Sequence, residues 1–330
     1  MRALYGLPDR RAALARLRRA SATFDDADAV HSEARDRLLE RLPLFRLSPR
    51  RIIDLGAATG KAVPELAALY PDARILAVDL CRHMAARAQA RCRRLESAAA
   101  VTGDAERLPL RDGSIDLIFS NLLLPWCDPG AVFSEAARVL REGGLLLFTA
   151  AGPDTLAEVR QAWSEVDDGL HVHGFVDMHD LGDLAARSGL AEPVLDIDRL
   201  TVAYSGIDRL VSDLRACGAT NVAHGRRASL TGRKRWQAFR ERLAASGEAA
   251  SRPEDAEASS SGNNPPGGDA PPDDGDNGNG SGRGLSISVE LIFGQAWGTG
   301  KDVAPGTPEA AVPAETEISV EALRRKLRSL

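Results

Sequence analysis

The chain reads Ile52-Ile53-Asp54-Leu55-Gly56-Ala57-Ala58-Thr59-Gly60-Lys61 where its first apolar strand meets a helix, and this segment indicates the architecture of the 330 residues. The strand delivers an acid, and a glycine-spaced turn then opens the helix. Glycine permits a sharp turn and lets a ligand approach the backbone with no Cβ in the way. The spacing differs from the Gly-x-Gly-x-x-Gly of dinucleotide-binding proteins and from the Walker phosphate loop. Taken alone, it also fits an ordinary tight turn between a strand and a helix.

Strands and helices alternate along the chain after residue 50. The expected strands are 51–55, 74–79, 99–102, 115–120 and 145–150, with helices at 61–69, 82–95 and 129–140. Later helices are expected at 155–166, 178–188 and 207–216, and two β-rich runs, 194–204 and 285–293, can pair antiparallel at the sheet edge. This alternation indicates βαβ crossovers covering both faces of a sheet. The predicted fold class is α/β and Rossmann-like, a mostly parallel seven-stranded sheet with an antiparallel edge hairpin.

Composition divides the chain into four parts. Residues 1–48 are expected to form a helical segment that covers the cleft, and residues 49–246 together with 284–298 to form the main domain. Residues 247–283 hold eight acidic residues against two arginines and are rich in Ser, Gly, Asn and Pro. They cannot bury enough apolar area to offset their ordering entropy, so this insert is predicted to be disordered. The tail 299–330 is expected to be flexible, with one short helix at 319–330.

The overall composition excludes several classes of protein. With 44% apolar and 27% charged residues, the chain is neither fibrous nor wholly disordered. No apolar stretch approaches the ~20 residues needed to cross a bilayer. The four cysteines form no CxxC pair and no zinc-type cluster, which favours a reducing compartment. Residues 1–24 are Arg- and Ala-rich like a transit peptide, but Asp9 interrupts them and no secretion signal follows, so the cytoplasm is the expected location.

Polar side chains end four consecutive strands of the predicted sheet. Asp54 and Asp79 belong to the first two strands, and Asp104 and Asn121 follow the third and fourth. Open α/β sheets bind ligands at the carboxyl ends of their strands. Asp79 is placed to accept hydrogen bonds from both ribose hydroxyls, and Asp104 from an exocyclic adenine amine. One acid at a strand end is usually a helix cap, but four polar ends in succession indicate a nucleoside site.

These residues resemble the class I S-adenosylmethionine-dependent methyltransferases. The resemblance covers about residues 15–298 outside the insert and rests on 54–60, 79, 103–109, 116–121 and 140–144. It implies S-adenosyl-L-methionine as the cofactor. The cofactor-binding residues that it implies are Asp54, Gly56, Ala57, Gly60, Asp79, Leu80, Asp104, Ala105 and Asn121.

Segments outside the cofactor motifs are similar to one narrower family, the malonyl-acyl carrier protein O-methyltransferases of biotin synthesis. These segments are 18–25, 124–127, 148–156, 175–181, 213–221, 230–233 and 293–298. The resemblance implies methyl transfer to the free carboxyl of a malonyl thioester, with an acidic acyl carrier protein as partner. The acceptor-side residues that it implies are Trp126 as a lid and Arg18, Arg19 or His173 for the carboxylate. A basic run is expected to steer the carrier protein: Arg226, Arg227, Arg233, Lys234 and Arg235.

Several residues depart from the family's usual pattern. Phe24 and Phe293 stand where Tyr is usual, Pro125 where Gln or His is usual, and Gln295 where His is usual. His31 stands near a usual Gln. Phe24 has no hydroxyl, so this position cannot hydrogen-bond a substrate as a tyrosine would. These departures concern the acceptor more than the cofactor.

Other interpretations stay open. The chain is also similar to the mitochondrial complex I assembly factors, which hydroxylate an arginine on the same fold, and a non-catalytic cofactor-binding scaffold is a further alternative. Arg18 and Arg19 could lie on a solvated helix face, and Trp126 in the core. No metal site is expected, because the histidines 171, 173 and 179 lack a Cys or carboxylate set at ligand spacing. No nucleic-acid partner is expected, since the Asn-Pro-Pro-Tyr type of motif is absent after the fourth strand. No membrane partner is expected either, since no apolar stretch is long enough to cross a bilayer. Oligomeric state and carrier protein versus coenzyme A stay undecided.

Overall fold

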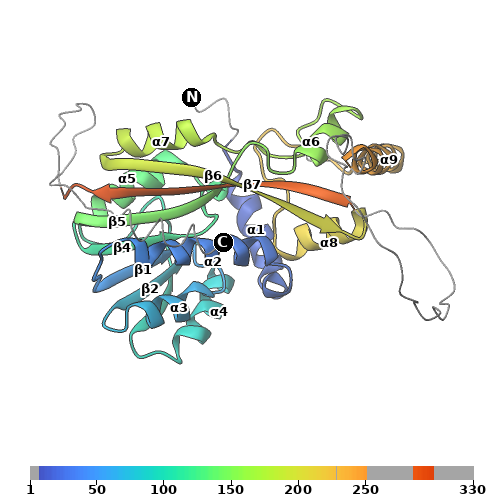
Figure 1. The fold of residues 1–330 in the computed structure, drawn as a ribbon. Coiled ribbons are helices and arrows are strands. Elements are labelled where there is room, and N and C mark those ends of the chain that lie inside the picture. Colours follow the sequence, from blue (N-terminus) through green and yellow to red (C-terminus); the bar gives the residue numbers. More distant parts are fainter. Residues whose placement is uncertain (1–6, 228, 251–284, 301–330) are drawn as a thin grey trace, which may run out of the picture.

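A single twisted sheet organises the computed structural model, which describes residues 7–227, 229–250 and 285–300 (Figure 1). The strand order is β3-β2-β1-β4-β5-β7-β6. β1 to β5 pair in parallel, and β7 lies antiparallel between β5 and β6. The strands are β1 Arg51–Leu55, β2 Arg74–Asp79, β3 Ala98–Thr102, β4 Ile115–Ser120, β5 Leu140–Ala151, β6 Leu190–Tyr204 and β7 Leu285–Gly298. The predicted fold class, including the antiparallel edge pair, is confirmed.

Helices cover both faces of the sheet. α2, α3 and α4 pack on one face and α5 and α7 on the other, each against a separate cluster of buried apolar side chains (Figure 1). All six residues of β4 are buried, as expected for a central strand between two helical layers. The helices are α1 Arg10–Ala20, α2 Ala29–Arg41, α3 Ala62–Leu69, α4 Arg82–Cys92, α5 Pro129–Val139, α6 Ala157–Ser164, α7 Met178–Arg187, α8 Ile207–Ala216 and α9 Arg233–Ala250. Short 3₁₀ turns lie at η1 Phe24–Asp26, η2 Leu42–Leu44 and η3 Leu124–Trp126.

β6 and β7 run past the parallel strands and carry a second layer of helices, α6, α8 and α9, at their far end (Figure 1). A third apolar cluster lies there, in which Trp163 of α6 stacks on Phe239 of α9 with ring centroids 4.3 Å apart. α9 was not expected from the sequence. Its buried residues Phe239 and Leu243 are four apart, with Trp236 packed beside them, so a helical stripe was readable beneath the basic run.

Several predicted boundaries shift. β5 begins at Leu140 rather than at 145, because Leu140 pairs with Ile115 before an irregularity in the ladder. The first four residues of the predicted acidic insert, 247–250, continue α9. The rest of that insert and the predicted helix at 319–330 lie outside the described residues. Within the described ranges, no helix is long and apolar enough to span a membrane.

Candidate active site

The turn after β1 depends on two glycines in left-handed conformations. Gly56 has φ +75° and Gly60 has φ +78°, values that residues with a side chain rarely adopt. A Cβ on Gly56 would lie 2.9 Å from the side chain of Leu123, and one on Gly60 would lie 2.9 Å from the Cα of Ala88. Close packing against η3 and α4 therefore requires glycine at both ends of the turn.

Asp79, the last residue of β2, ties that strand to the glycine turn. One carboxylate oxygen accepts a hydrogen bond from the backbone N–H of Ala58 at 2.9 Å. The other accepts from the N–H of Cys81 at 2.7 Å. Burial raises the pKa of Asp79 to about 6 and outweighs these two hydrogen bonds, which lower it. The carboxylate is therefore fixed in position at the carboxyl ends of the parallel strands.

Asp54 lies beneath the same turn and is 3% exposed. Its Oδ2 atom is buried and has no hydrogen-bond partner among the described residues. Burial, together with the nearby carboxylates of Asp79 and Glu65, raises the pKa of Asp54 to about 7. A buried carboxylate oxygen without a partner is costly, so this atom is suited to a cationic ligand group.

The ends of β3 and β4 are also held by specific contacts. Asp104 forms an ion pair with Arg10 of α1 at 2.5 Å. Asn121 donates from Nδ2 to the carbonyl oxygen of His31 at 2.9 Å, and its Oδ1 accepts from the Thr149 hydroxyl at 2.7 Å. The N-terminal helices are thus fastened across the strand ends.

These strand ends line one cavity. It has a volume of about 80 Å³, and the predicted cofactor residues that line it are Gly56, Asp79, Leu80, Asp104, Ala105 and Asn121. Asp54 and Ala57 line a smaller cavity of about 40 Å³, which shares Gly56 and Asn121 with the first. Gly60 lines neither and instead packs against α4. The α1 residues Arg10, Ala13, Leu14 and Leu17 line the first cavity as well. We call this the strand-end cavity.

Asp25 is a site-forming residue that the sequence analysis did not identify. Its carboxylate accepts hydrogen bonds from the Thr59 hydroxyl at 2.6 Å, from Arg91 at 2.7 Å and from Arg87 at 3.0 Å. Burial would raise its pKa, but these three donors together lower it to about 2. Asp25 therefore fastens η1 to the glycine turn and to α4, which closes the N-terminal segment over the strand-end cavity.

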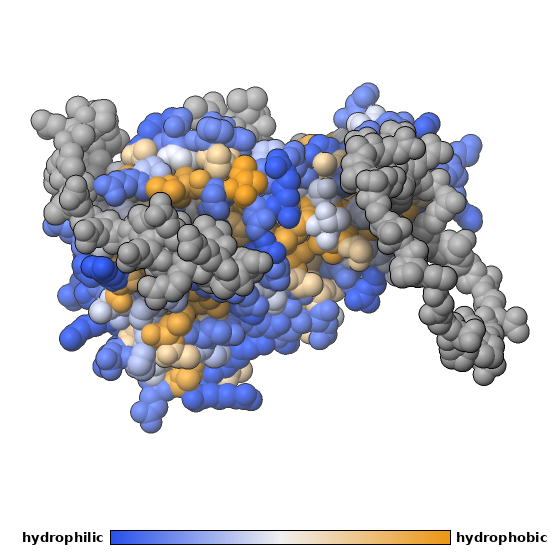
Figure 2. Space-filling view, in the orientation of Figure 1, coloured by the Kyte–Doolittle hydropathy of each residue, from blue (hydrophilic) through white to orange (hydrophobic). Residues whose placement is uncertain are grey.

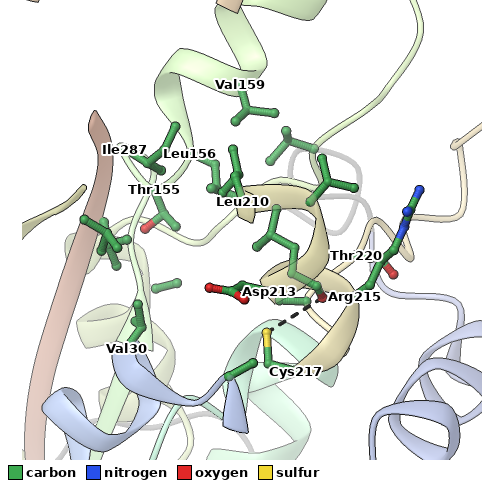
Figure 3. A pocket seen from close by; sticks show the side chains of 18 of the residues that line it. Val30, Thr155, Leu156, Val159, Leu210, Asp213, Arg215, Cys217, Thr220 and Ile287 are labelled. Carbon is green, nitrogen blue, oxygen red and sulfur yellow. Dashed lines mark hydrogen bonds between the residues drawn. The ribbon is translucent and has the colours of Figure 1, made fainter. Parts of the chain in front are cut away.

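A much larger cavity, of about 870 Å³, adjoins the first on the side of α6, α8 and α9 (Figure 3). We call it the acceptor-side cavity. Its lining is mainly apolar, and its polar residues include Thr155, Tyr204, Asp213 and Arg215. Figure 3 shows Asp213 among the apolar side chains, and Figure 2 shows apolar residues in a hollow beside α8 with hydrophilic residues on both sides. Sequence reasoning included Asp213 in a family segment but gave it no role. The two cavities share the lining residues His31, Leu122, Trp126 and Cys217.

Trp126 and His173 are brought together at this shared wall. Trp126 ends η3, and its ring centroid lies 6.1 Å from that of His173. His173 is buried, and its Nε2 atom has no partner among the described residues. Burial, with a smaller effect of Arg160, lowers the pKa of His173 to about 4, so this histidine is neutral at physiological pH. Burial also lowers the pKa of His31 to about 4.

Arg18 and Arg19 lie apart from that pair. Both are exposed on α1, and neither lines the strand-end cavity or the acceptor-side cavity. Arg19 instead lines a separate basic chamber. The other two histidines of the 171–179 stretch are engaged locally, His171 with Asp167 at 2.7 Å and His179 with Asp177 at 2.9 Å. Within the described residues, no group of three metal-ligating side chains is present.

The doubly covered sheet, its glycine turn and the two adjoining cavities define a methyltransferase of the Rossmann-like type. Residues 53–148 match the family model described as a methyltransferase domain, which confirms the predicted cofactor, S-adenosylmethionine. The chain is 43% identical over 228 residues to the malonyl-[acyl-carrier protein] O-methyltransferase of Laribacter hongkongensis, covering 66% of this chain and 77% of that protein. It is 35% identical over 307 residues to the protein of the same name from Halorhodospira halophila, covering 92% of each chain. The chain therefore belongs to the malonyl-[acyl-carrier protein] O-methyltransferase family.

The similarities extend to solved structures. The YcgJ protein from Bacillus subtilis superposes with a TM-score of 0.51 at 16% identity, over 81% of this chain and 98% of that one. At this identity the likeness concerns the fold alone. The relatives confirm the family predicted from the sequence and favour methyl transfer over arginine hydroxylation.

Proposed function

We propose that this chain transfers a methyl group from S-adenosylmethionine to the free carboxyl of a malonyl group on an acyl carrier protein, as a step of biotin synthesis. The observation that carries the proposal is the wall shared by the two cavities. On one side of Trp126 and His31 lie the strand-end residues, and on the other lies a large apolar cavity. The shared residues mark the place where the two cavities adjoin. A methyl donor bound in one cavity and an acceptor bound in the other would therefore come together beside Trp126 and His31.

The chemical groups of the strand-end residues match groups of the cofactor. The carboxylate of Asp79 suits the ribose hydroxyls, and Gly56 leaves the backbone of the turn open to a ligand. The unpartnered Oδ2 of Asp54 suits a cationic group such as the amino group of the methionine part. When bound, the cofactor supplies an electrophilic methyl group on a sulfonium sulfur. The residues of the chain orient it and keep water away.

The acceptor needs no general base. A carboxylic acid is ionised at neutral pH, so the malonyl carboxylate is ready to attack the methyl carbon. The chain's task is to hold that carboxylate in line and to exclude water. We assign this role to His173 and Trp126 rather than to Arg18 or Arg19, which lie on the exposed face of α1. As the Nε2–H tautomer, neutral His173 can donate one hydrogen bond to the carboxylate.

A neutral donor suits this chemistry better than an arginine would. A guanidinium binds a carboxylate through two charged hydrogen bonds, which stabilise the ground state and weaken the nucleophile. A neutral histidine in an apolar cavity positions the carboxylate through one uncharged donor. The carboxylate then keeps most of its negative charge and its nucleophilicity toward the methyl carbon. Because its pKa is lowered to about 4, His173 stays neutral between pH 6 and 8.

We place the protein in the cytoplasm, with an acidic carrier protein as its partner and no nucleic acid. Its four cysteines are free and buried, as in proteins of reducing compartments. The test of the proposed function is a mass-resolved assay with purified protein, S-adenosylmethionine and malonyl-carrier protein. We expect one added methyl on the malonyl group and none on acetyl-carrier protein, which has no free carboxyl. Cofactor binding by calorimetry without methylation of the malonyl group would refute the proposed acceptor.

A further inference from the structure

A third cavity, of about 610 Å³, adjoins the acceptor-side cavity on its outer side. The two share the lining residues His171, Arg215, Thr220 and Asn221. The strand-end cavity, the acceptor-side cavity and this outer chamber therefore follow one another, each sharing part of its wall with the next. A ligand in the outer chamber would lie next to the apolar cavity, whose lining includes Trp126.

The outer chamber is strongly basic. Its lining includes five arginines and, among the described residues, no carboxylate: Arg16, Arg19, Arg215, Arg226 and Arg227. We call these residues the arginine chamber. Arg226 pairs with Asp9 at 3.1 Å, and Arg227 lies 3.6 Å from Asp167. In the described part of the chain, no ion pair involves Arg16, Arg19 or Arg215. Three cations in the lining therefore remain available to an anion.

The elements that carry these arginines are fixed to each other. Arg16 and Arg19 lie on α1, and Arg215 lies at the end of α8. The Thr23 hydroxyl donates to the Ala216 carbonyl at 2.9 Å, which joins the end of α1 to α8. Gly218 packs close to α1, since a Cβ there would lie 3.2 Å from that of Ala20. The positive charges are thus gathered by packing between segments about 200 residues apart in sequence.

A second observation also points to a ligand. The Oγ1 atom of Thr220 is buried and has no hydrogen-bond partner among the described residues. Thr220 lies on the wall between the arginine chamber and the acceptor-side cavity, beside Arg215 in Figure 3. An unpaired hydroxyl next to unpaired guanidinium groups matches a phosphate, which accepts hydrogen bonds from both.

We infer that the arginine chamber binds the phosphate of the phosphopantetheine arm that carries the malonyl thioester. This inference rests on the proposed function. The cavities occur in the order of the arm's chemistry: the carboxylate beside Trp126, the uncharged arm in the apolar cavity, and the phosphate among the arginines. The 870 Å³ cavity is also far larger than a malonyl group needs, which leaves room for the arm.

The test compares two small thioesters, malonyl-phosphopantetheine and malonyl-pantetheine, which differ only in the phosphate. We expect the unmodified protein to methylate the phosphorylated thioester with a kcat/KM at least about tenfold higher, the scale of a charge-assisted hydrogen bond. Arg16→Gln and Arg19→Gln, which line the arginine chamber but not the acceptor-side cavity, should each reduce that ratio severalfold and leave kcat/KM for malonyl-pantetheine unchanged. Arg11→Gln, an exposed arginine on α1 outside the described cavities, is the matched control and should keep the full ratio.

Each other outcome has a defined meaning. Equal methylation of both thioesters by the unmodified protein would overturn the inference while leaving the proposed function intact. If the arginine variants lose kcat/KM on malonyl-carrier protein but not on malonyl-phosphopantetheine or malonyl-coenzyme A, the arginines contact the carrier protein's surface. That result would also overturn the inference. An equal loss of kcat/KM by the arginine variants on all three phosphate-bearing thioesters would support the inference. Absence of methylation on every acceptor would instead refute the proposed function.

Discussion

Replacing Asp54 with asparagine should stabilise the protein at pH 8 and weaken its hold on the cofactor. Asp54 is buried, its Oδ2 has no partner, and its pKa is raised to about 7 by burial and by Asp79. An unfolded aspartate has a pKa of about 3.9. The folded protein therefore binds the Asp54 proton more tightly than the unfolded chain does. The unfolding free energy that this residue contributes is present at pH 4 and is lost as the pH rises through about 7.

The size of the effect follows from the difference between these pKa values. One pKa unit corresponds to about 1.4 kcal/mol, so a shift from about 3.9 to about 7 costs on the order of 4 kcal/mol at pH 8. Asparagine removes the charge but leaves a buried amide without hydrogen-bond partners, and this offsets part of the gain in unfolding free energy. We expect Asp54→Asn to raise the unfolding free energy by about 1–3 kcal/mol at pH 8 and by little at pH 5.

Urea unfolding at the two pH values measures this difference, and calorimetry measures S-adenosylmethionine binding. The variant should bind the cofactor at least about tenfold more weakly at pH 8, because it lacks the charged oxygen that the ligand's cation would meet. In the unmodified protein, cofactor affinity should fall as the pH drops below 7, since Asp54 must lose its proton to pair with that cation.

Asp116→Asn is the matched control, because Asp116 is a buried carboxylate with partners. It pairs with Arg141 at 2.5 Å and accepts from the backbone N–H of Arg51 at 2.7 Å. Burial would raise its pKa, but these contacts lower it, so its stabilising effect is present at neutral pH and lost in acid. This variant should lose about 1–3 kcal/mol at pH 8. If Asp54→Asn lost stability at pH 8 as well, Asp54 would not be an uncompensated buried charge, and its proposed role would be refuted.

Three further changes test the rest of the site. Asp79→Asn should weaken S-adenosylmethionine binding at least about tenfold by calorimetry, whereas the exposed Asp72→Asn should not; equal affinities would contradict the ribose assignment. Gly60→Ala should lower the unfolding free energy by about 1–3 kcal/mol, because its φ is +78° and the new Cβ would lie 2.9 Å from the Cα of Ala88; an unchanged urea midpoint would count against this packing. His173→Phe should reduce kcat/KM for the malonyl thioester at least about tenfold with unchanged cofactor affinity, and the unmodified protein should show no ionisation of this histidine in its rate profile between pH 6 and 8.

The meeting of the strand-end residues at one edge of the sheet was predictable because its information is local in sequence. Asp54, Gly56 and Asp79 each stand at a fixed place relative to a strand end, and parallel strands bring their carboxyl ends to one edge. Periodicity then predicted the sheet that carries them. What the pattern did not indicate is the unpaired state of the Asp54 oxygen, which depends on burial by surrounding segments.

The acceptor half was less predictable because tertiary packing creates it. α9 was missed because its apolar stripe is narrow and lies within a basic run. In the structure that stripe is buried where Phe239 packs on Trp163. Arg18 and Arg19 were adjacent candidates in sequence, but successive residues of an α-helix point about 100° apart, so the two side chains lie on different faces of α1. Only Arg19 faces the arginine chamber, and neither reaches the cavity beside Trp126. Asp25 likewise acquires its role from Thr59 and Arg91, which the chain order does not place near it.

Acceptor specificity can vary within this fold without any change at the strand ends. The strand-end residues belong to the sheet and its turns, whereas the large cavity is built from α6, α8, α9 and the far ends of β6 and β7. A change among the latter alters the shape and charge that an acceptor meets without touching the glycine turn. Only the shared wall, His31, Leu122, Trp126 and Cys217, must suit both ligands at once. Of the residues that depart from the family's usual pattern, Phe24, Phe293 and Gln295 lie outside that wall, and Pro125 lines the large cavity but not the strand-end cavity. His31 belongs to the wall, so it is the one departure that both proposed ligands would meet.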